Sequence, residues 1–476
     1  MLVNLSTSLG PTTVGRVRQL RRFLPHLSGL VVPRLGRNFS LLVLRTLAPP
    51  LIVFGQPNPT ALKYCESLLE RAESGNAYTN AFSKLFHTTA MSEAKCLDQM
   101  TSRELMKAKL AGVPIAIKDN IDSLPGPCCA GLGSFSNYHP NKDAKIVEKL
   151  RTAGAIIVGA ARTDAGAFGV TTPEVTNPKF PDRIVGGSSG GPAAAVAAGL
   201  CTAAIGTDTG GSIRIPAACC GVYGFKPTYG RVSLAGVRPL APSYDHVGPI
   251  AQCVADLVEV MHVIDPDFTE TSRPLASDPL VLGVPSNCFS DASPEVQANF
   301  ENFISKMRDR GCEVRDIFLP PPDEVLPMHF ALSLHEAALQ YEHLSADDIS
   351  RLPPPAIEGI NYGRSISNAQ VQAAKERKRD LIHHFDKAAE TVDAIVMPTL
   401  PVLVPERNEQ QLLIGSCPTD TLMDLVRYTA TFDQTGQPAL AVPWAADGAK
   451  LPFSIQLIGA RNQDLKLLEI AAELEL

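Results

Sequence analysis

The sequence predicts an α/β protein in which helices pack on both faces of a central β-sheet. Residues 144–153 have apolar side chains at helical spacing, Gly154 is placed to end that helix, and residues 155–158 are typical of a buried strand. The same order of helix and apolar run recurs over residues 293–317 and 367–396. Repeated alternation of helix and strand is the pattern of an α/β sheet covered by helices.

The N-terminal stretch differs in composition from the rest of the chain. Residues 1–65 contain no aspartate or glutamate but seven arginines, interleaved with serine, threonine and leucine. This composition is typical of an organellar transit peptide. We therefore predict a transit peptide over residues 1–57 and a mitochondrial location. The alternative is a disordered extension without targeting function, in which case the protein is cytoplasmic.

The apolar part of this stretch is too short to cross a membrane. Residues 39–47 and 51–54 are largely apolar, but Arg45 and the Pro49–Pro50 pair interrupt them. A membrane span needs about 20 apolar residues, so none is predicted. Ordered structure is expected to begin with a helix over residues 60–72, where leucine and alanine recur at helical spacing.

Capping signals mark two further helices. Ser293 followed by Pro294 predicts the start of a helix with one apolar stripe, which Gly311 is placed to end. Ser367 and Gln370 predict a capping box at the start of a long helix.

Prolines mark the remaining predicted boundaries. Pro192 is placed to begin a short helix through Ala198, because proline at the first helical position loses no needed N–H. The proline-rich stretches 352–355 and 398–405 are predicted to be surface connections.

Composition excludes several classes of function. Hydrophobic residues make up 45% and charged residues 19% of the chain, as in globular proteins. The formal net charge of -6 gives no general electrostatic reason to expect nucleic-acid binding. The histidines lack metal-ligand spacing, so no metal site is predicted. The odd number of cysteines, eleven, without a C-x-x-C pair, favours reduced thiols over a disulfide framework.

Two glycine-flanked serine turns are the candidate functional motifs. They are GGSSGG at residues 186–191 and GTDTGGS at residues 206–212. Glycine tolerates positive φ and a close backbone approach, so each turn can direct a hydroxyl and several N–H groups into one cavity. A serine nucleophile needs a base. Lys118 ends a short apolar run and is expected at the end of a buried strand, where burial would lower its pKa and allow it to act as that base.

Three motifs follow one another along the chain: the run Gly112–Asn120, the GGSSGG turn, and GTDTGGSIRIPA at residues 206–217. Taken in this order, they resemble the amidase signature family of serine hydrolases. The resemblance covers roughly residues 58–476 and implies one catalytic domain with that family's mixed central sheet. In the family, catalysis uses a lysine, a serine in a cis peptide linkage and a nucleophilic serine. The matching residues are Lys118, Ser188 and Ser212.

The second turn also has the features of an oxyanion site. Donors are needed where the oxygen of an amide carbonyl becomes negative. The backbone N–H groups of Thr209, Gly210, Gly211 and Ser212 are clustered suitably, and the glycines have no side chain to block substrate. Asp208 and Arg214 are expected to brace this loop, with direct contact to substrate as the alternative. Ser189 is expected to support the first turn.

The resemblance implies hydrolysis of the carbon–nitrogen bond of a small-molecule amide through an acyl-enzyme on Ser212, without cofactor or metal. One alternative is the related A subunit of glutamyl-tRNA(Gln) amidotransferase, which releases ammonia from glutamine within a heteromeric complex. Its Ser-Ser-Asn-Leu and Arg-Tyr-Asp-Gly stretch is replaced here by residues 342–348. A second alternative is a non-catalytic binding module of the same fold. As a self-contained amidase, the chain could also form a homodimer.

A nucleotide-binding enzyme is not predicted. Neither glycine turn fits the P-loop pattern, and Gly131-Leu132-Gly133 lacks a complete G-x-G-x-x-G motif.

Overall fold

The computed structural model describes residues 60–268, 279–350, 352–409, 411–414, 417–419, 422–444, 451–474 and 476. Residues 59–476 form one compact unit. The transit-peptide prediction for residues 1–57 lies outside the described residues, so that segment and the mitochondrial location stay predictions. In the described part of the chain, none of the helices combines the length and apolarity needed to cross a membrane.

A mixed sheet forms the centre of the fold, and eleven strands of the described chain belong to it. In sheet order the strands are β1 (Phe82–Leu85), β3 (Ile156–Ala161), β2 (Pro114–Lys118), β4 (Ala203–Asp208), β6 (His246–Ala251), β5 (Tyr223–Lys226), β12 (Ala439–Trp444), β13 (Phe453–Ile458), β9 (Ala394–Pro398), β7 (Val281–Val284) and β8 (Glu313–Asp316). β3, β2 and β4 run parallel, as do β9, β7 and β8, while the strands between these two groups pair antiparallel. A separate hairpin joins β10 (Leu413–Ile414) and β11 (Cys417–Pro418).

Helices cover both faces of this sheet. The helices packed on it or beside it are α3 (Ala61–Thr79), α4 (His87–Gln99), α5 (Ser102–Leu105), α6 (Lys145–Thr152), α7 (Gly190–Ala197), α8 (Arg214–Cys220), α9 (Val254–Ile264), α10 (Pro294–Asp309), α15 (Ala430–Thr435) and α16 (Asp464–Glu473). On one face, residues such as Ala116, Val158 and Ala204 form an apolar cluster with side chains of α3, α4, α7 and α8. On the other face, α9 packs on β4 and β6 and contacts α6 and α16.

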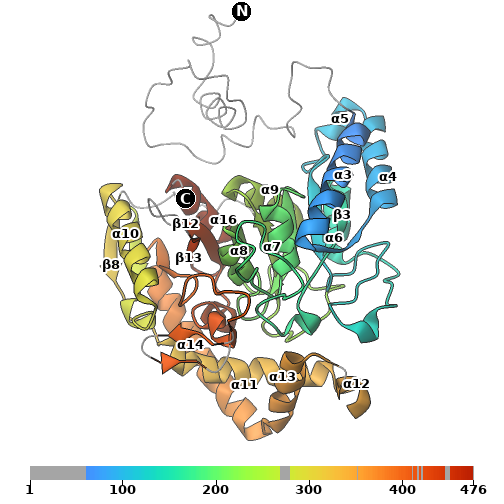
Figure 1. Ribbon diagram of the computed structural model, residues 1–476. Helices are drawn as coiled ribbons and strands as arrows, with labels where there is room; N and C mark the ends of the chain where they lie inside the picture. The colour runs from blue at the N-terminus through green and yellow to red at the C-terminus, as the bar shows by residue number, and fades with distance from the viewer. Residues whose placement is uncertain are drawn as a thin grey trace, which may run out of the picture. The chain divides into compact units, whose positions relative to one another are not determined.

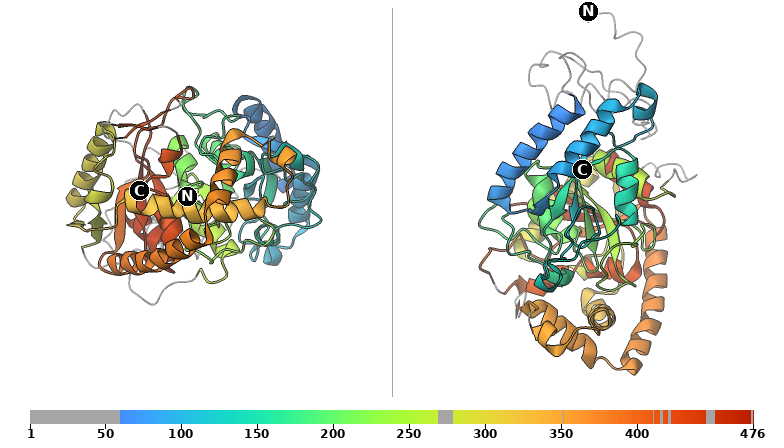
Figure 2. Two further views of the ribbon diagram at one scale, coloured as in Figure 1. Left: turned by 90° about the horizontal axis from the view of Figure 1, so that it is seen from below. Right: turned by 90° about the vertical axis from the view of Figure 1, so that its right-hand side faces the viewer.

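Four further helices gather at one end of the sheet. They are α11 (Pro322–Gln340), α12 (Ala346–Ser350), α13 (Pro354–Ser365) and α14 (Asn368–Glu390). Figure 1 shows them in gold and orange at the lower end of the molecule, and the right-hand view of Figure 2 places them opposite the blue helices α3–α5. α11 contacts α13, α14 and α15, and α15 is hydrogen-bonded to Arg214, which follows the loop after β4.

Local signals predicted the helix starts well. The side chain of Ser293 accepts the Val296 N–H at the start of α10, and Ser367 and Gln370 form the predicted capping box at the start of α14. The first helix begins at Ala61 with Thr60 as its cap and extends to Thr79, beyond the predicted end at residue 72.

Three boundary predictions were wrong. Helix α7 begins at Gly190, two residues before Pro192, because the second half of the GGSSGG turn is itself helical. Pro354 begins α13 instead of lying in a connection. Residues 398–405 are not a surface connection: Leu400 and Val404 are buried in an apolar cluster that also contains residues of α8 and α11.

Candidate active site

Lys118 ends β2, whose five residues are all buried. Its Nζ lies 2.8 Å from Ser188 Oγ and 2.8 Å from Thr207 Oγ1, within hydrogen-bond distance of both. Burial lowers the pKa of Lys118 to about 7, although the nearby carboxylates, including Asp164, act in the opposite direction. A large fraction of this lysine is therefore neutral near pH 7, which is the protonation state that a general base requires.

The first glycine turn places Ser188 against this lysine. The Gly187–Ser188 peptide bond is cis, as the family resemblance implies. Glycine is required at position 187 because a Cβ there would collide with the Asp164 carboxylate and the Thr171 backbone. The Ser189 hydroxyl lies 3.1 Å from the Thr207 carbonyl, to which it donates, and 3.3 Å from the Thr207 N–H, which it accepts. Ser189 thus joins the turn to the end of β4.

The second glycine turn lies directly beside the first. The Ser189 N–H donates to the Ser212 carbonyl over 3.2 Å, so the two turns are hydrogen-bonded to each other. The Ser212 residue is 8% exposed, so the hydroxyl lies at the edge of the interior instead of on the open surface. The structure therefore brings Lys118 into contact with Ser188 and places Ser212 next to Ser189.

The predicted oxyanion loop has one donor fewer than the sequence indicated. The Gly211 N–H donates to Asp208 Oδ1 at 2.5 Å, so this N–H is engaged within the protein. The Thr209 hydroxyl donates to Asp245 Oδ1 at 2.7 Å, and the Gly210 carbonyl accepts from Thr429 Oγ1 at 2.6 Å. The N–H groups of Thr209, Gly210 and Ser212 remain the candidate oxyanion donors.

Gly211 has a steric role in this loop. Its φ of +135° lies in the region that favours glycine, and a Cβ there would collide with the Thr429 side chain. We expect Gly211→Ala to displace the loop and lower kcat/KM for amides roughly 100-fold, because misplacement by about 1 Å has effects of that size. The rate at which a fluorophosphonate labels Ser212 should fall in parallel.

Gly199→Ala is the matched control. Gly199 also has positive φ, +69°, but a Cβ there would meet no atom within 4 Å. This variant should lose some stability and keep its rate of labelling. Equal labelling rates in the two variants would contradict the steric role of Gly211.

Asp208 and Arg214 form hydrogen bonds within the loop, and both are fully buried. Asp208 accepts from the Gly211 and Ile213 N–H groups and from the Arg214 guanidinium, with Nε and Nη2 each at 3.0 Å. Burial alone would raise the pKa of Asp208, but the Arg214 charge and hydrogen bonds outweigh burial and hold it below its ordinary value. Arg214 also donates to Asp433 Oδ2 at 2.6 Å, which connects the loop to α15.

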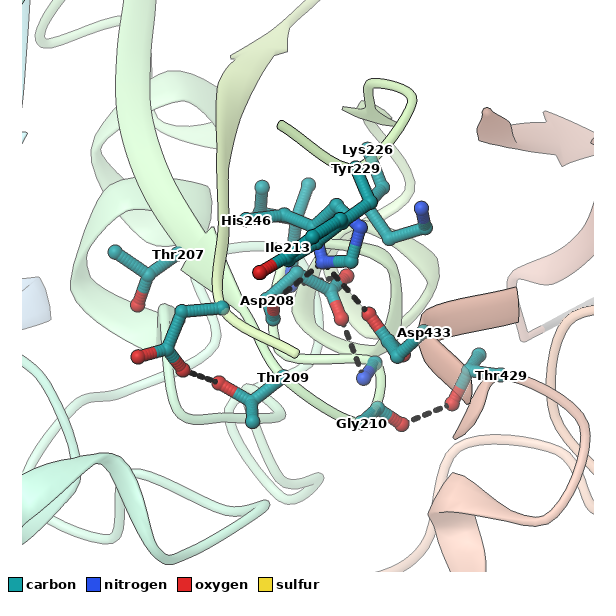
Figure 3. Close-up of polar contacts among 12 residues, drawn as sticks. Thr207, Asp208, Thr209, Gly210, Ile213, Lys226, Tyr229, His246, Thr429 and Asp433 are labelled. Atoms are coloured by element: carbon teal, nitrogen blue, oxygen red, sulfur yellow. Dashed lines mark hydrogen bonds and ion pairs between the residues drawn. The ribbon is translucent and has the colours of Figure 1, made fainter. Parts of the chain in front are cut away.

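Figure 3 shows His246 between the Asp208 backbone and the Asp433 carboxylate. Its Nδ1 lies 3.2 Å from the Asp208 carbonyl oxygen and 3.3 Å from Asp433 Oδ1. Burial lowers the pKa of His246 well below its ordinary value, so the ring is neutral. Because Nδ1 faces two oxygen atoms, it carries the ring hydrogen. His246 therefore donates to the Asp208 carbonyl and lies beside the Asp433 carboxyl group.

Sequence reasoning missed Thr207, Thr429 and Asp433. Thr207 lies inside the GTDTGGS motif, and its position directly after an apolar run could have indicated a hydroxyl at the strand end. Thr429 and Asp433 have no local signal, because they lie more than 200 residues from the loop that they contact. Their role depends on α15 packing against that loop.

The described part of the chain contains no cluster of three or more histidine, cysteine or acidic side chains that could hold a metal ion. The structure describes the side chains of ten cysteines, and all ten are free thiols; Cys96 is exposed while six others are buried.

Comparison with known protein families identifies the family of this chain. Residues 63–468 match the family model described as Amidase. The chain belongs to the amidase family. This amidase is an amide-hydrolysing enzyme, and its buried Lys118 and its two glycine turns lie together.

Similar proteins span nearly the whole chain. The A subunit of glutamyl-tRNA(Gln) amidotransferase from Acidobacterium capsulatum is 32% identical, over 87% of this amidase and 94% of the relative. A crystal structure of an amidase superposes with a TM-score of 0.80 at 32% identity, covering 88% of this chain and 96% of the other. The peptide amidase of Stenotrophomonas maltophilia superposes with a TM-score of 0.73 at 26% identity, covering 88% and 93%.

Proposed function

We propose that this amidase hydrolyses the carbon–nitrogen bond of small-molecule amides through an acyl-enzyme on Ser212. The observation that carries the proposal is the contact between the buried Lys118 and Ser188, 2.8 Å long and formed by a lysine whose pKa is lowered to about 7. Thr207 Oγ1 accepts an N–H from Lys118, which leaves the lone pair of the neutral amine for the Ser188 hydroxyl.

In the first half-reaction, Lys118 takes the proton of Ser188, and Ser188 takes the proton of Ser212. The freed Ser212 oxygen attacks the carbonyl carbon and forms a tetrahedral intermediate. The N–H groups of Thr209, Gly210 and Ser212 stabilise its oxyanion. Return of the proton through Ser188 to the substrate nitrogen allows the carbon–nitrogen bond to break, which releases the amine and leaves the acyl-enzyme.

In the second half-reaction, water attacks the acyl-enzyme. Ser188 and Lys118 take its proton, the bond between the acyl carbon and Ser212 breaks, and the proton returns through Ser188 to the Ser212 oxygen. The products are a carboxylic acid and the regenerated serine. Every step uses groups of the protein and water, so the reaction needs no cofactor.

A fluorophosphonate probe tests the nucleophile. We expect the full-length protein to be labelled stoichiometrically, with the label on the peptide that contains Ser212. Ammonia release from a panel of primary amides then tests hydrolysis. A protein that stays unlabelled under conditions where it turns over amides would contradict the assignment of Ser212.

The A subunit of a heteromeric amidotransferase is a second candidate, favoured by the 32% identity to its counterpart in Acidobacterium capsulatum. In that case the protein would release ammonia from glutamine and deliver it to a partner chain. Purification from its own cells separates the two: a stable complex with a second chain and glutamine-specific ammonia release would favour the amidotransferase. Hydrolysis of several amides by the isolated chain, as a monomer or a homodimer, favours the self-contained amidase.

A further inference from the structure

Two buried polar side chains outside the proposed proton relay lie beside the oxyanion loop. His329 belongs to α11 and is 3% exposed, and Gln434 belongs to α15 and is fully buried. Burying a polar group without a hydrogen bond is energetically unfavourable. Buried polar side chains without partners therefore call for a functional explanation.

Three polar atoms of these side chains lack hydrogen-bond partners within the described chain. His329 Nδ1 and both polar atoms of the Gln434 carboxamide are buried and have no hydrogen-bond partner among the described residues. The Gln434 carboxamide is close enough to His329 and Tyr244 to influence the pKa of each, but neither contact meets hydrogen-bond geometry. The protein thus holds donors and acceptors in the interior that it does not itself use.

Both residues adjoin the loop that carries the proposed nucleophile. A Cβ at Gly210 would lie 3.3 Å from His329 Nε2, so the imidazole borders the oxyanion loop. Thr429 immediately precedes α15 and donates to the Gly210 carbonyl, which fixes α15, and with it Gln434, against the same loop. His329 and Gln434 therefore lie on two elements that both contact the oxyanion loop.

The pair offers hydrogen bonds without charge. Burial lowers the pKa of His329 to about 4, so the imidazole is neutral at pH 7, and a glutamine side chain carries no charge. The positive charge of Lys378 is engaged by other groups. Its ammonium group lies 3.7 Å from the Tyr244 ring centre and donates to the Ser243 carbonyl at 3.4 Å. Together the imidazole and the carboxamide present both donors and acceptors, which suits a neutral group that also has both.

We propose that His329 and Gln434 bind a second carboxamide in the acyl part of the substrate, so that the enzyme prefers diamides. A carboxamide supplies an N–H donor and a carbonyl acceptor that match those of Gln434 and the imidazole. A carboxylate lacks the donor, and an alkyl group lacks both. This inference rests on the proposed amide hydrolysis and specifies its substrate class.

Ammonia release from three isosteric primary amides tests the preference. They are glutaramide, 5-methylhexanamide and glutaramic acid, which end in a carboxamide, an isopropyl group and a carboxylate. A second series, built on succinamide, is one methylene shorter and places the terminal group nearer to the reacting carbonyl. We expect kcat/KM for the diamide to exceed that for either analogue by about tenfold or more in at least one series, since one or two hydrogen bonds have effects of that size. Equal values in both series, or a preference for the carboxylate, would overturn the proposal.

Substitutions assign the preference to the two residues. Gln434→Met and His329→Phe keep approximate side-chain size, and each should reduce the ratio of kcat/KM between diamide and isopropyl analogue about tenfold. Gln372→Met and His383→Phe are matched controls on the exposed side of α14 and should leave this ratio unchanged. A ratio unchanged in both Gln434→Met and His329→Phe would refute the assignment.

Binding to Ser212→Ala separates this proposal from the reaction itself. Calorimetry with glutaramide and 5-methylhexanamide measures recognition without turnover. Tighter binding of glutaramide, weakened about tenfold by Gln434→Met, supports the subsite even if no amide is hydrolysed. Equal binding of both ligands in an enzyme that a fluorophosphonate labels on Ser212 would overturn the subsite and leave the proposed function intact.

Discussion

Ser212→Ala is expected to lower kcat/KM for amides by about 10⁴- to 10⁶-fold, the loss seen when a serine hydrolase loses its nucleophile. The alanine cannot form the acyl-enzyme, so fluorophosphonate labelling should disappear as well. The substitution deletes one oxygen atom at the edge of the interior, where Ser212 is 8% exposed. The thermal midpoint should therefore change by no more than about 2 °C.

The control for this prediction is Ser134→Ala, which removes a hydroxyl from an exposed position outside the two glycine turns. It should keep wild-type turnover and labelling. If Ser212→Ala retained a tenth or more of the wild-type kcat/KM, another residue would have to be the nucleophile.

Lys118→Met is expected to reduce kcat/KM by about 10³-fold or more, within the range that general-base catalysis contributes. The wild-type enzyme should show kcat/KM rising with pH through a pKa of about 7 and reaching a plateau above it, because only the neutral lysine accepts a proton. The variant should lose this rising limb. Lys142→Met, on the surface, is the control. A variant that kept the wild-type profile would show that another group is the base.

The same substitution should alter stability by an amount that depends on pH. The folded pKa of Lys118, about 7, lies below the ordinary value of 10.5. Below pH 7 both the folded and the unfolded states bind the proton, so the folded state bears the full cost of burying the charge. Between pH 7 and 10.5 the unfolded state binds more protons, so stability rises with pH.

Lys118→Met removes that cost, so its stability relative to wild type should be greater at pH 7 than at pH 10. The difference is roughly 3 kcal/mol. Denaturant titrations of both proteins at the two pH values measure it. A difference that did not change with pH would contradict a lowered pKa for this lysine.

Local signals in the sequence predicted the starts of two helices and the chemical types of the residues at the site. The caps at Ser293 and Ser367 could be predicted because a capping side chain bonds a backbone group only three residues away. The apolar run before Lys118 likewise predicted a lysine at the end of a buried strand, and the two glycine turns predicted where serine hydroxyls meet backbone donors.

Which of these groups are free to bind a substrate depends on how distant segments of the chain pack together. The Gly211 N–H could be counted as an oxyanion donor from the sequence, but the folded loop engages it with Asp208. Thr429 and Asp433 hold the loop from α15, and His329 reaches it from α11. No local pattern predicts such contacts, because they depend on packing between segments more than 100 residues apart.

Burial of the site was also a property of the whole fold. The apolar residues before Lys118 predicted the direction of its pKa shift, but its size comes from desolvation by all the elements packed around β2. For the same reason residues 398–405 became interior although their prolines indicated a surface connection. Desolvation and long-range packing depend on which elements surround a residue, and only the assembled sheet and helices determine those neighbours.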